Sequence, residues 1–274
     1  MRPEESSAPI RTRGIDIRPF PTAARLALGA GRACRRRAAM HYLLTADVTA
    51  ARRLMAMSPR TLSLTGFVAV AVARAAAEIP VVHSYRDWRG RLVSHRHVDV
   101  LVPIETQTEY GPRTVPHIVP DADTRDVAEV SKELLAAKES PAPGILEGLP
   151  RLAGIPGLIR AAYTALDRSV RLRQQIGTVM VASTGMRDVG EGFGVAAPSL
   201  MPLQVVIGSM CPQPHQTGNH IEQHEMLNLT LTFDGSIVGN AQAADFAMRL
   251  CAAIEHADAL QPQEMPEHPV RGVL

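Results

Sequence analysis

The chain has 274 residues, of which 46% are hydrophobic and 20% charged, a composition that indicates a folded globular protein and excludes a disordered one. Its 29 basic and 27 acidic side chains leave a net charge of only +2, which does not indicate nucleic-acid binding. The 3 cysteines form no metal-type pair, so they suggest neither a zinc site nor a disulfide framework and favour a reducing, cytoplasmic location.

The domain organisation follows from length and local composition. We expect a flexible leader at residues 1–17, one large domain at 18–262 and a C-terminal tail at 263–274. The start is charged and carries prolines, so it does not resemble a secretory signal. The most apolar stretch, residues 65–78, is shorter than the roughly 18 residues that cross a bilayer, so no integral membrane contact is expected.

In chain order, the first half alternates helical and strand patterns. Apolar spacing predicts helices at 21–37, 49–57 and 63–78, with Ser63 or Thr65 at the start of the third and Asp47 or Thr49 capping the second. Strands are expected at 41–48, in a hairpin over 81–97, and at 98–104 and 114–119. Pro103 favours an edge or the end of a strand. Residues 121–124 should cap a helix at 125–138.

The second half begins with a proline- and glycine-rich insertion at 144–173. Its last part carries an apolar stripe with arginines mostly elsewhere, a pattern that fits a membrane, a partner, a long acyl chain or, more simply, packing on its own domain. Strands follow at 178–183, 203–209 and 226–233, and a final helix at 241–256. Together these elements predict an α+β fold in two layers, with helices on a mixed sheet.

Three segments in order resemble one known family. They are residues 114–123, a strand running into Asp121-Ala122-Asp123; residues 177–186, a Gly-Thr strand with a serine and a Gly-Met turn; and residues 227–246, a strand ending in Phe233-Asp234 before a helix. This order is similar to the catalytic domain of the 2-oxoacid dehydrogenase acyltransferases, which are chloramphenicol acetyltransferase-like. The resemblance covers about residues 20 to 256 and implies that fold.

The sequence departs from the family at its catalytic loop. Aligned on Phe233-Asp234, the family's catalytic histidine falls on Gly235 and its supporting aspartate on Gly239. In the family that histidine takes the proton from the attacking thiol or hydroxyl, a role that glycine cannot fill. The resemblance places substrate binding at Gly235, Gly239 and Asn240, and a hydroxyl that stabilises the oxyanion at Ser183.

Other histidines are candidates for the missing base. His41 lies where the family often has a histidine near the active-site channel, and His224 belongs to a group with His215 and His220 just before the last strand. His220, Glu222 and His224 share one strand face because their spacing is even, so a metal pair, a substitute base and a polar turn or edge strand all remain open, and we assign no metal site. His83, His95 and His97 are expected close together in the hairpin, most simply for packing.

The resemblance implies an enzyme that binds a CoA- or carrier-linked acyl thioester and transfers the acyl group to a small-molecule acceptor. It also implies a homotrimer with active sites between subunits, an acyl carrier protein as an alternative donor, and no permanently bound cofactor. Loss of the histidine favours two alternatives: a non-catalytic binding or assembly subunit, and altered chemistry such as elimination, hydrolysis or cyclisation in the same site.

Overall fold

The computed structural model describes residues 38–108, 111–140, 156–184, 191–217 and 220–261. The expected leader, the helix at 21–37 and the tail at 263–274 lie outside these residues. None of the helices described there is long and apolar enough to cross a membrane.

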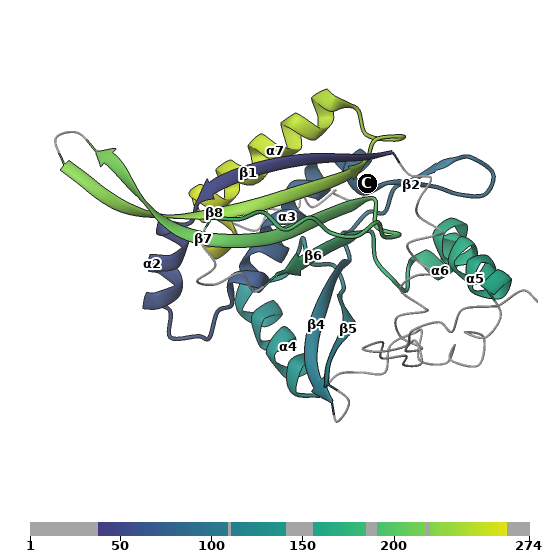
Figure 1. Ribbon diagram of the computed structural model, residues 1–274, viewed down its shortest axis with the longest axis horizontal. Coiled ribbons are helices and arrows are strands. Elements are labelled where there is room, and N and C mark those ends of the chain that lie inside the picture. The colour runs from purple at the N-terminus through teal and green to yellow at the C-terminus, as the bar shows by residue number, and fades with distance from the viewer. Residues whose placement is uncertain (1–37, 109–110, 141–155, 185–190, 218–219, 262–274) are drawn as a thin grey trace, which may run out of the picture.

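A six-stranded mixed sheet forms one layer of the protein (Figure 1). Its strands stand in the order β1-β8-β7-β6-β4-β5, and β6 runs parallel to both of its neighbours while the other pairs are antiparallel. The strands are β1 (Ala39–Asp47), β4 (Val100–Thr108), β5 (Gly111–Val119), β6 (Val179–Ser183), β7 (Leu203–Thr217) and β8 (His220–Asp234).

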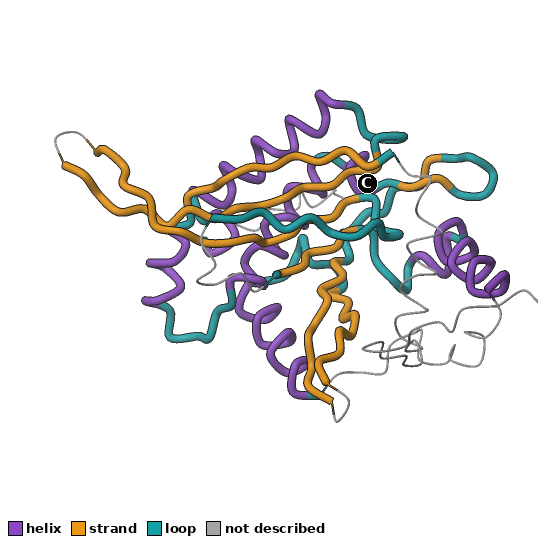
Figure 2. Tube along the Cα trace, viewed as in Figure 1, coloured by secondary structure: helices purple, strands orange, loops and turns teal. Residues whose placement is uncertain are grey.

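Helices on one face of the sheet form the other layer, as Figure 2 shows. They are α3 (Leu64–Glu78), α4 (Val127–Glu139) and α7 (Asn240–Glu255), with α2 (Thr49–Met57) and the short η3 (Asp258–Leu260) beside α7. α3 has almost no polar face, and ten of its residues are buried between the sheet, α4 and α7. One continuous apolar core joins these elements, so the predicted two-layer α+β fold is confirmed.

Local signals placed several of these elements correctly. α2 has the predicted bounds, and the Asp47 carboxylate accepts a hydrogen bond of 2.8 Å from the Thr49 amide at its start. Ser63 caps α3 by accepting a hydrogen bond from the Gly66 amide. The expectation that Pro103 marks an edge or a strand end was wrong, because it lies within β4, between β6 and β5; only Val100 and Leu101 pair with β6, so its missing N–H costs no bond on that side.

Three expectations about boundaries were wrong. The hairpin at 81–97 is reduced to β2 (Tyr85–Arg86) and β3 (Leu92–Val93), and its first arm begins as a 3₁₀ turn, η1 (Pro80–His83), because Pro80 fixes a turn-like φ. α4 begins after Asp126, which caps it, and not after Thr124. β7 and β8 extend far beyond the expected strands, because they pair with each other past the end of the sheet.

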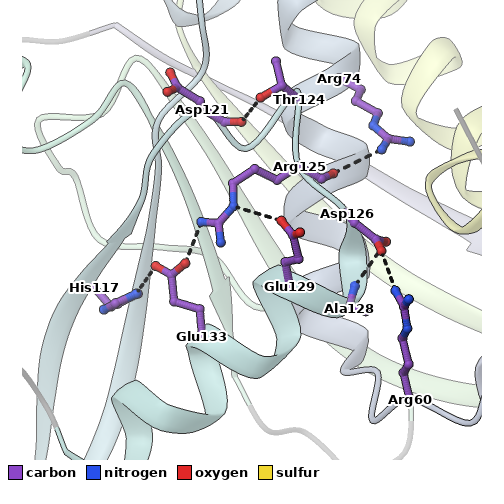
Figure 3. Close-up of polar contacts among 10 residues, drawn as sticks. All are labelled: Arg60, Arg74, His117, Asp121, Thr124, Arg125, Asp126, Ala128, Glu129 and Glu133. Atoms are coloured by element: carbon purple, nitrogen blue, oxygen red, sulfur yellow. Dashed lines mark hydrogen bonds and ion pairs between the residues drawn. The ribbon is translucent and has the colours of Figure 1, made fainter. Parts of the chain in front are cut away.

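Charged side chains tie the start of α4 to its neighbours (Figure 3). Arg125 reaches Glu129 and Glu133 on α4, and Glu133 accepts a hydrogen bond from His117 of β5 at 2.8 Å. The Arg125 carbonyl accepts from Arg74 of α3 at 3.2 Å. The network therefore fixes α4 against both the sheet edge and α3.

The insertion packs on its own domain, on the sheet face opposite α3. Its helices are α5 (Pro156–Arg168) and α6 (Val170–Arg173), and Tyr163 and Leu166 bury their side chains with Leu200 and Met201 in a small second core. Arg173 is fully buried, and its guanidinium lies 4.9 Å from the centre of the Tyr85 ring. Of the stripe Leu158, Ala162, Leu166 and Val170, only Leu166 is buried and both Leu158 and Val170 are exposed, so packing on this domain accounts for only part of it.

Candidate active-site loop

A tight loop joins β8 to α7 at the position where the family resemblance puts its catalytic residue. The Asp234 carboxylate holds this loop by accepting hydrogen bonds from the Ser236 amide at 3.1 Å and from its hydroxyl at 2.6 Å. The Asp234 carbonyl accepts from the amides of Ile237 and Val238. Arg86 of the small hairpin donates to the Ser236 hydroxyl at 3.4 Å, so β2 lies against the loop.

Gly235 is closed in by the start of β1. Its amide donates to the Ala38 carbonyl at 2.6 Å, and an added Cβ would stand 2.9 Å from the same oxygen. A carbon and a carbonyl oxygen do not approach that closely without a shift, and the obstacle is backbone, which yields less easily than a side chain. Position 235 therefore lacks the imidazole, and any side chain placed there would require the start of β1 to shift.

The two other proposed binding positions form the start of α7. Gly239 is the residue before the helix, and its amide donates to the Gln242 side chain at 3.0 Å. Asn240 is exposed, and its carbonyl accepts a hydrogen bond of 3.2 Å from the Tyr42 hydroxyl of β1. An added Cβ at Gly239 would meet nothing closer than 3.6 Å, so this position is open where Gly235 is closed.

His41 is presented on the sheet face that the core helices leave free. It pairs with Thr232 across β1 and β8, and its Nδ1 lies 2.9 Å from the Thr232 hydroxyl. The side chain is exposed, and its other nitrogen has no hydrogen-bond partner among the residues that the structure describes. Since Thr232 precedes Gly235 by three residues on the neighbouring strand, His41 lies roughly 11 Å from Gly235 between Cα positions.

Ser183 lies apart from His41. It ends β6, is exposed, and pairs with Ile207 of β7. Because side chains alternate along a strand, Ser183 points to the same face of the sheet as Val179 and Val181, which belong to the core. His41 points to the other face, since its paired residues across β8 and β7 lead to Met180 of β6. Three strand spacings and three residues separate the two, about 17 Å, so one chain does not bring this serine and this histidine together.

His224 lies farther still, on the extension of β8. Eight residues separate it from Thr232, which corresponds to about 27 Å along the strand. Its Nδ1 is hydrogen-bonded to the Asp47 carboxylate. Burial would raise the pKa of Asp47, but hydrogen bonds from Thr49 and from His224 outweigh it and lower that pKa. The carboxylate therefore stays ionised and fixes the orientation of the imidazole.

The histidines of the small hairpin separate into two places. His83 is only 1% exposed, and its burial, with His95 nearby, lowers its pKa to about 4, so it is neutral at pH 7. His95 lies 3.2 Å from the Tyr85 hydroxyl through its Nε2, and burial lowers its pKa as well. His97 instead pairs with Asp123 at 3.1 Å. His83 and His95 thus lie near each other, whereas His97 is hydrogen-bonded to Asp123 apart from them.

Sequence reasoning missed the residues that orient these imidazoles and the residue that closes the loop. Thr232 orients His41 and the Ala38 carbonyl closes in Gly235, and each of these contacts crosses from one strand to the next. Only the pairing register of β1 with β8 identifies them. Asp47 was noted as a helix cap, but its second oxygen holds His224, which is distant in sequence. The available signal was the even spacing of His220, Glu222 and His224, which showed that they share a strand face but not which residues contact them.

Comparison with known proteins defines the fold. No protein-family profile matches the chain, and no curated protein sequence does. The cubic core of the pyruvate dehydrogenase multienzyme complex superposes with a TM-score of 0.64 at 17% identity, covering 94% of this chain and 99% of that one. Dihydrolipoamide acetyltransferase from Azotobacter vinelandii gives 0.62 at 17% identity, over 89% and 94% of the two chains. Chloramphenicol acetyltransferase gives 0.52 at 16%, over 90% and 98%.

The chain therefore has the fold of the dehydrogenase-complex acyltransferase cores and of chloramphenicol acetyltransferase, as the sequence resemblance predicted. These likenesses extend over nearly the full length of the proteins compared. The Azotobacter structure addresses the role of a serine, a histidine and an asparagine in catalysis. At identities of 16–17% the likeness defines the fold alone, and the chemistry has to be argued from the side chains of this chain.

Proposed function

We propose that this protein is an acyltransferase, which moves an acyl group from a CoA- or carrier-linked thioester to a small-molecule acceptor with His41 as its general base. The observation that carries the proposal is the His41–Thr232 contact of 2.9 Å, which orients an exposed imidazole on the sheet face opposite α3, on the strand that also reaches the Gly235 loop. An imidazole held by one nitrogen and free at the other is the arrangement that a general base requires.

The reaction follows from that arrangement. His41 Nε2 takes the proton of the acceptor hydroxyl or thiol, whose oxygen or sulfur attacks the thioester carbonyl carbon. The tetrahedral intermediate carries its negative charge on the former carbonyl oxygen. When it collapses, the carbon–sulfur bond breaks and the leaving thiolate receives the proton from the imidazolium. The Ser183 hydroxyl is proposed as the hydrogen-bond donor to the oxyanion.

This scheme requires more than one chain. His41 and Ser183 lie on opposite faces of one sheet and about 17 Å apart by strand geometry, whereas a base and an oxyanion donor must meet at one substrate. We therefore propose a homotrimer in which the serine of one copy faces the histidine of the next. Light scattering coupled to size exclusion tests the assembly, and a strictly monomeric active enzyme would contradict it.

Activity is tested with acetyl-CoA and a panel of alcohol and thiol acceptors, by following the CoA thiol that is released. We expect transfer above background, a decrease of about 10²- to 10⁴-fold for His41→Ala and of about 10²- to 10³-fold for Ser183→Ala. His256→Ala serves as the matched control, because it removes an exposed histidine at the end of α7 that has no part in the scheme. An unchanged rate for His41→Ala would remove His41 as the base.

One observation favours a second candidate function, a binding or assembly subunit without catalysis. A Cβ added at residue 235 would stand only 2.9 Å from the Ala38 carbonyl oxygen, so the loop does not accept a side chain without a shift of the backbone. If the protein binds acetyl-CoA in calorimetry but releases no CoA thiol with any acceptor or with water, this second function replaces the first. CoA release to water alone would instead indicate hydrolysis in the same site.

A further inference from the structure

The extension of β7 and β8 beyond the sheet forms a two-stranded ribbon, which projects away from the domain in Figure 1. β1 pairs with β8 only as far as Met226, so residues beyond that point in β8 pair with β7 alone. In the ribbon His215 stands directly opposite Glu222, and His224 is two residues farther along on the same face. Because paired residues of antiparallel strands share a face, these three side chains project to the same side.

The contacts confirm that the three side chains converge. The ring centres of His215 and His224 are 4.6 Å apart, and His224 Nε2 lies 3.9 Å from Glu222 Oε2. His215 and Glu222 are exposed, while the His224 side chain is 19% exposed. Two imidazoles and a carboxylate thus share one accessible patch of the ribbon.

Asp47 fixes the orientation of one side chain in this patch, His224. Its carboxylate is hydrogen-bonded to His224 Nδ1, which leaves Nε2 facing Glu222. A histidine that ligates a metal commonly donates its other ring N–H to a carboxylate in this way, which fixes the tautomer and raises the basicity of the ligating nitrogen. The Asp47 carboxylate, hydrogen-bonded to His224 Nδ1, stands in this position.

The surrounding charge also favours a cation. Gln213, which pairs with His224, donates to the Glu191 carboxylate at 3.3 Å, so a third acidic group lies on this side of the ribbon. Asp47 and Glu222 therefore flank His224, and Glu191 lies beside Gln213, the strand partner of His224. Among the described residues, no lysine or arginine forms a salt bridge with Glu222.

We infer that His215, His224 and Glu222 form a Zn²⁺ site, with Asp47 orienting His224 and a fourth position open to water. Two histidines and one carboxylate are a ligand set that zinc accepts with an open position. Donor atoms around a tetrahedral zinc ion stand about 3.3 Å apart, close to the 3.9 Å between His224 and Glu222. As they stand, no three such side chains among the described residues are placed to hold a metal ion, so the proposed site requires the exposed side chains of His215 and Glu222 to rotate toward His224.

The test is titration of the full chain, free of any affinity tag, with ZnCl₂ in a calorimeter near neutral pH. We expect saturable binding of one Zn²⁺ per chain. His224→Ala, His215→Ala and Glu222→Gln should each weaken binding at least about tenfold, and Asp47→Asn by about 10- to 100-fold through loss of orientation. Circular dichroism without metal confirms that each variant is folded.

Two controls separate this site from adventitious binding. His220→Ala removes another exposed histidine from the same ribbon face, and Cys211→Ser removes a thiol near its base; both should keep the affinity of the parent protein. Absence of saturable binding up to about 100 µM Zn²⁺ overturns the inference. So does a loss in His220→Ala or Cys211→Ser as large as the loss in His215→Ala.

Discussion

Replacing Gly235 by alanine tests whether the start of β1 closes the loop. The new Cβ would stand 2.9 Å from the Ala38 oxygen and 3.6 Å from the Met40 Cβ. Relieving that overlap requires a backbone shift at a place where Gly235 and Ala38 are hydrogen-bonded, and overpacking of this kind costs about 1–3 kcal/mol. Alanine also restricts the unfolded chain, a gain of about 0.4–1 kcal/mol. The net loss should be about 1–2 kcal/mol.

Gly239→Ala is the matched control, because it is the same substitution four residues away in open space. Its nearest contact would be 3.6 Å, and the φ of −80° suits alanine. We expect its free energy of unfolding to lie within about 0.5 kcal/mol of the parent, since the unfolded-state gain offsets a slightly poorer helix cap. Urea denaturation followed by circular dichroism measures both variants, with equal m-values required for the comparison.

The result that would refute this reasoning is a Gly235→Ala protein as stable as Gly239→Ala. It would mean that β1 moves aside freely and that the loop can accept a side chain. Gly235→His would then become a meaningful attempt to restore a base at this position. If instead Gly235→Ala is destabilised as expected, restoring the histidine requires a compensating change at the start of β1.

Two further predictions concern stability. Since burial lowers the pKa of His83 to about 4, the unfolded chain binds the extra proton, so stability is complete above about pH 6.5 and falls by about 2–3 kcal/mol toward pH 4. Urea midpoints against pH should show a shallower decline in His83→Leu, and an equal slope in both proteins would contradict the assignment. Arg125→Ala should lower the free energy of unfolding by about 1 kcal/mol, because Arg125 forms ion pairs with both Glu133 and Glu129. Arg60→Ala is the control: it breaks the exposed pair with Asp126 and should cost under about 0.5 kcal/mol. Thermal denaturation compares the two, and equal losses would refute the role of the network.

Much of the fold could be predicted because its signals are local. Ser63 before an unbroken apolar run marks a buried helix wherever it packs. The likeness to known acyltransferase structures then followed from three short segments in the right order. The missing side chain at Gly235 is likewise a property of the sequence alone.

The candidate sites depended on contacts between distant residues. The sequence shows that residue 235 is glycine, but only the pairing of β1 with β8 places the Ala38 carbonyl against it. Similarly, the spacing of Glu222 and His224 fixes their shared face, while the register with β7 adds His215 and the end of β1 adds Asp47. Residue type and spacing determine which groups a strand can present; cross-strand register, set by the packing of the whole sheet, decides which of them meet.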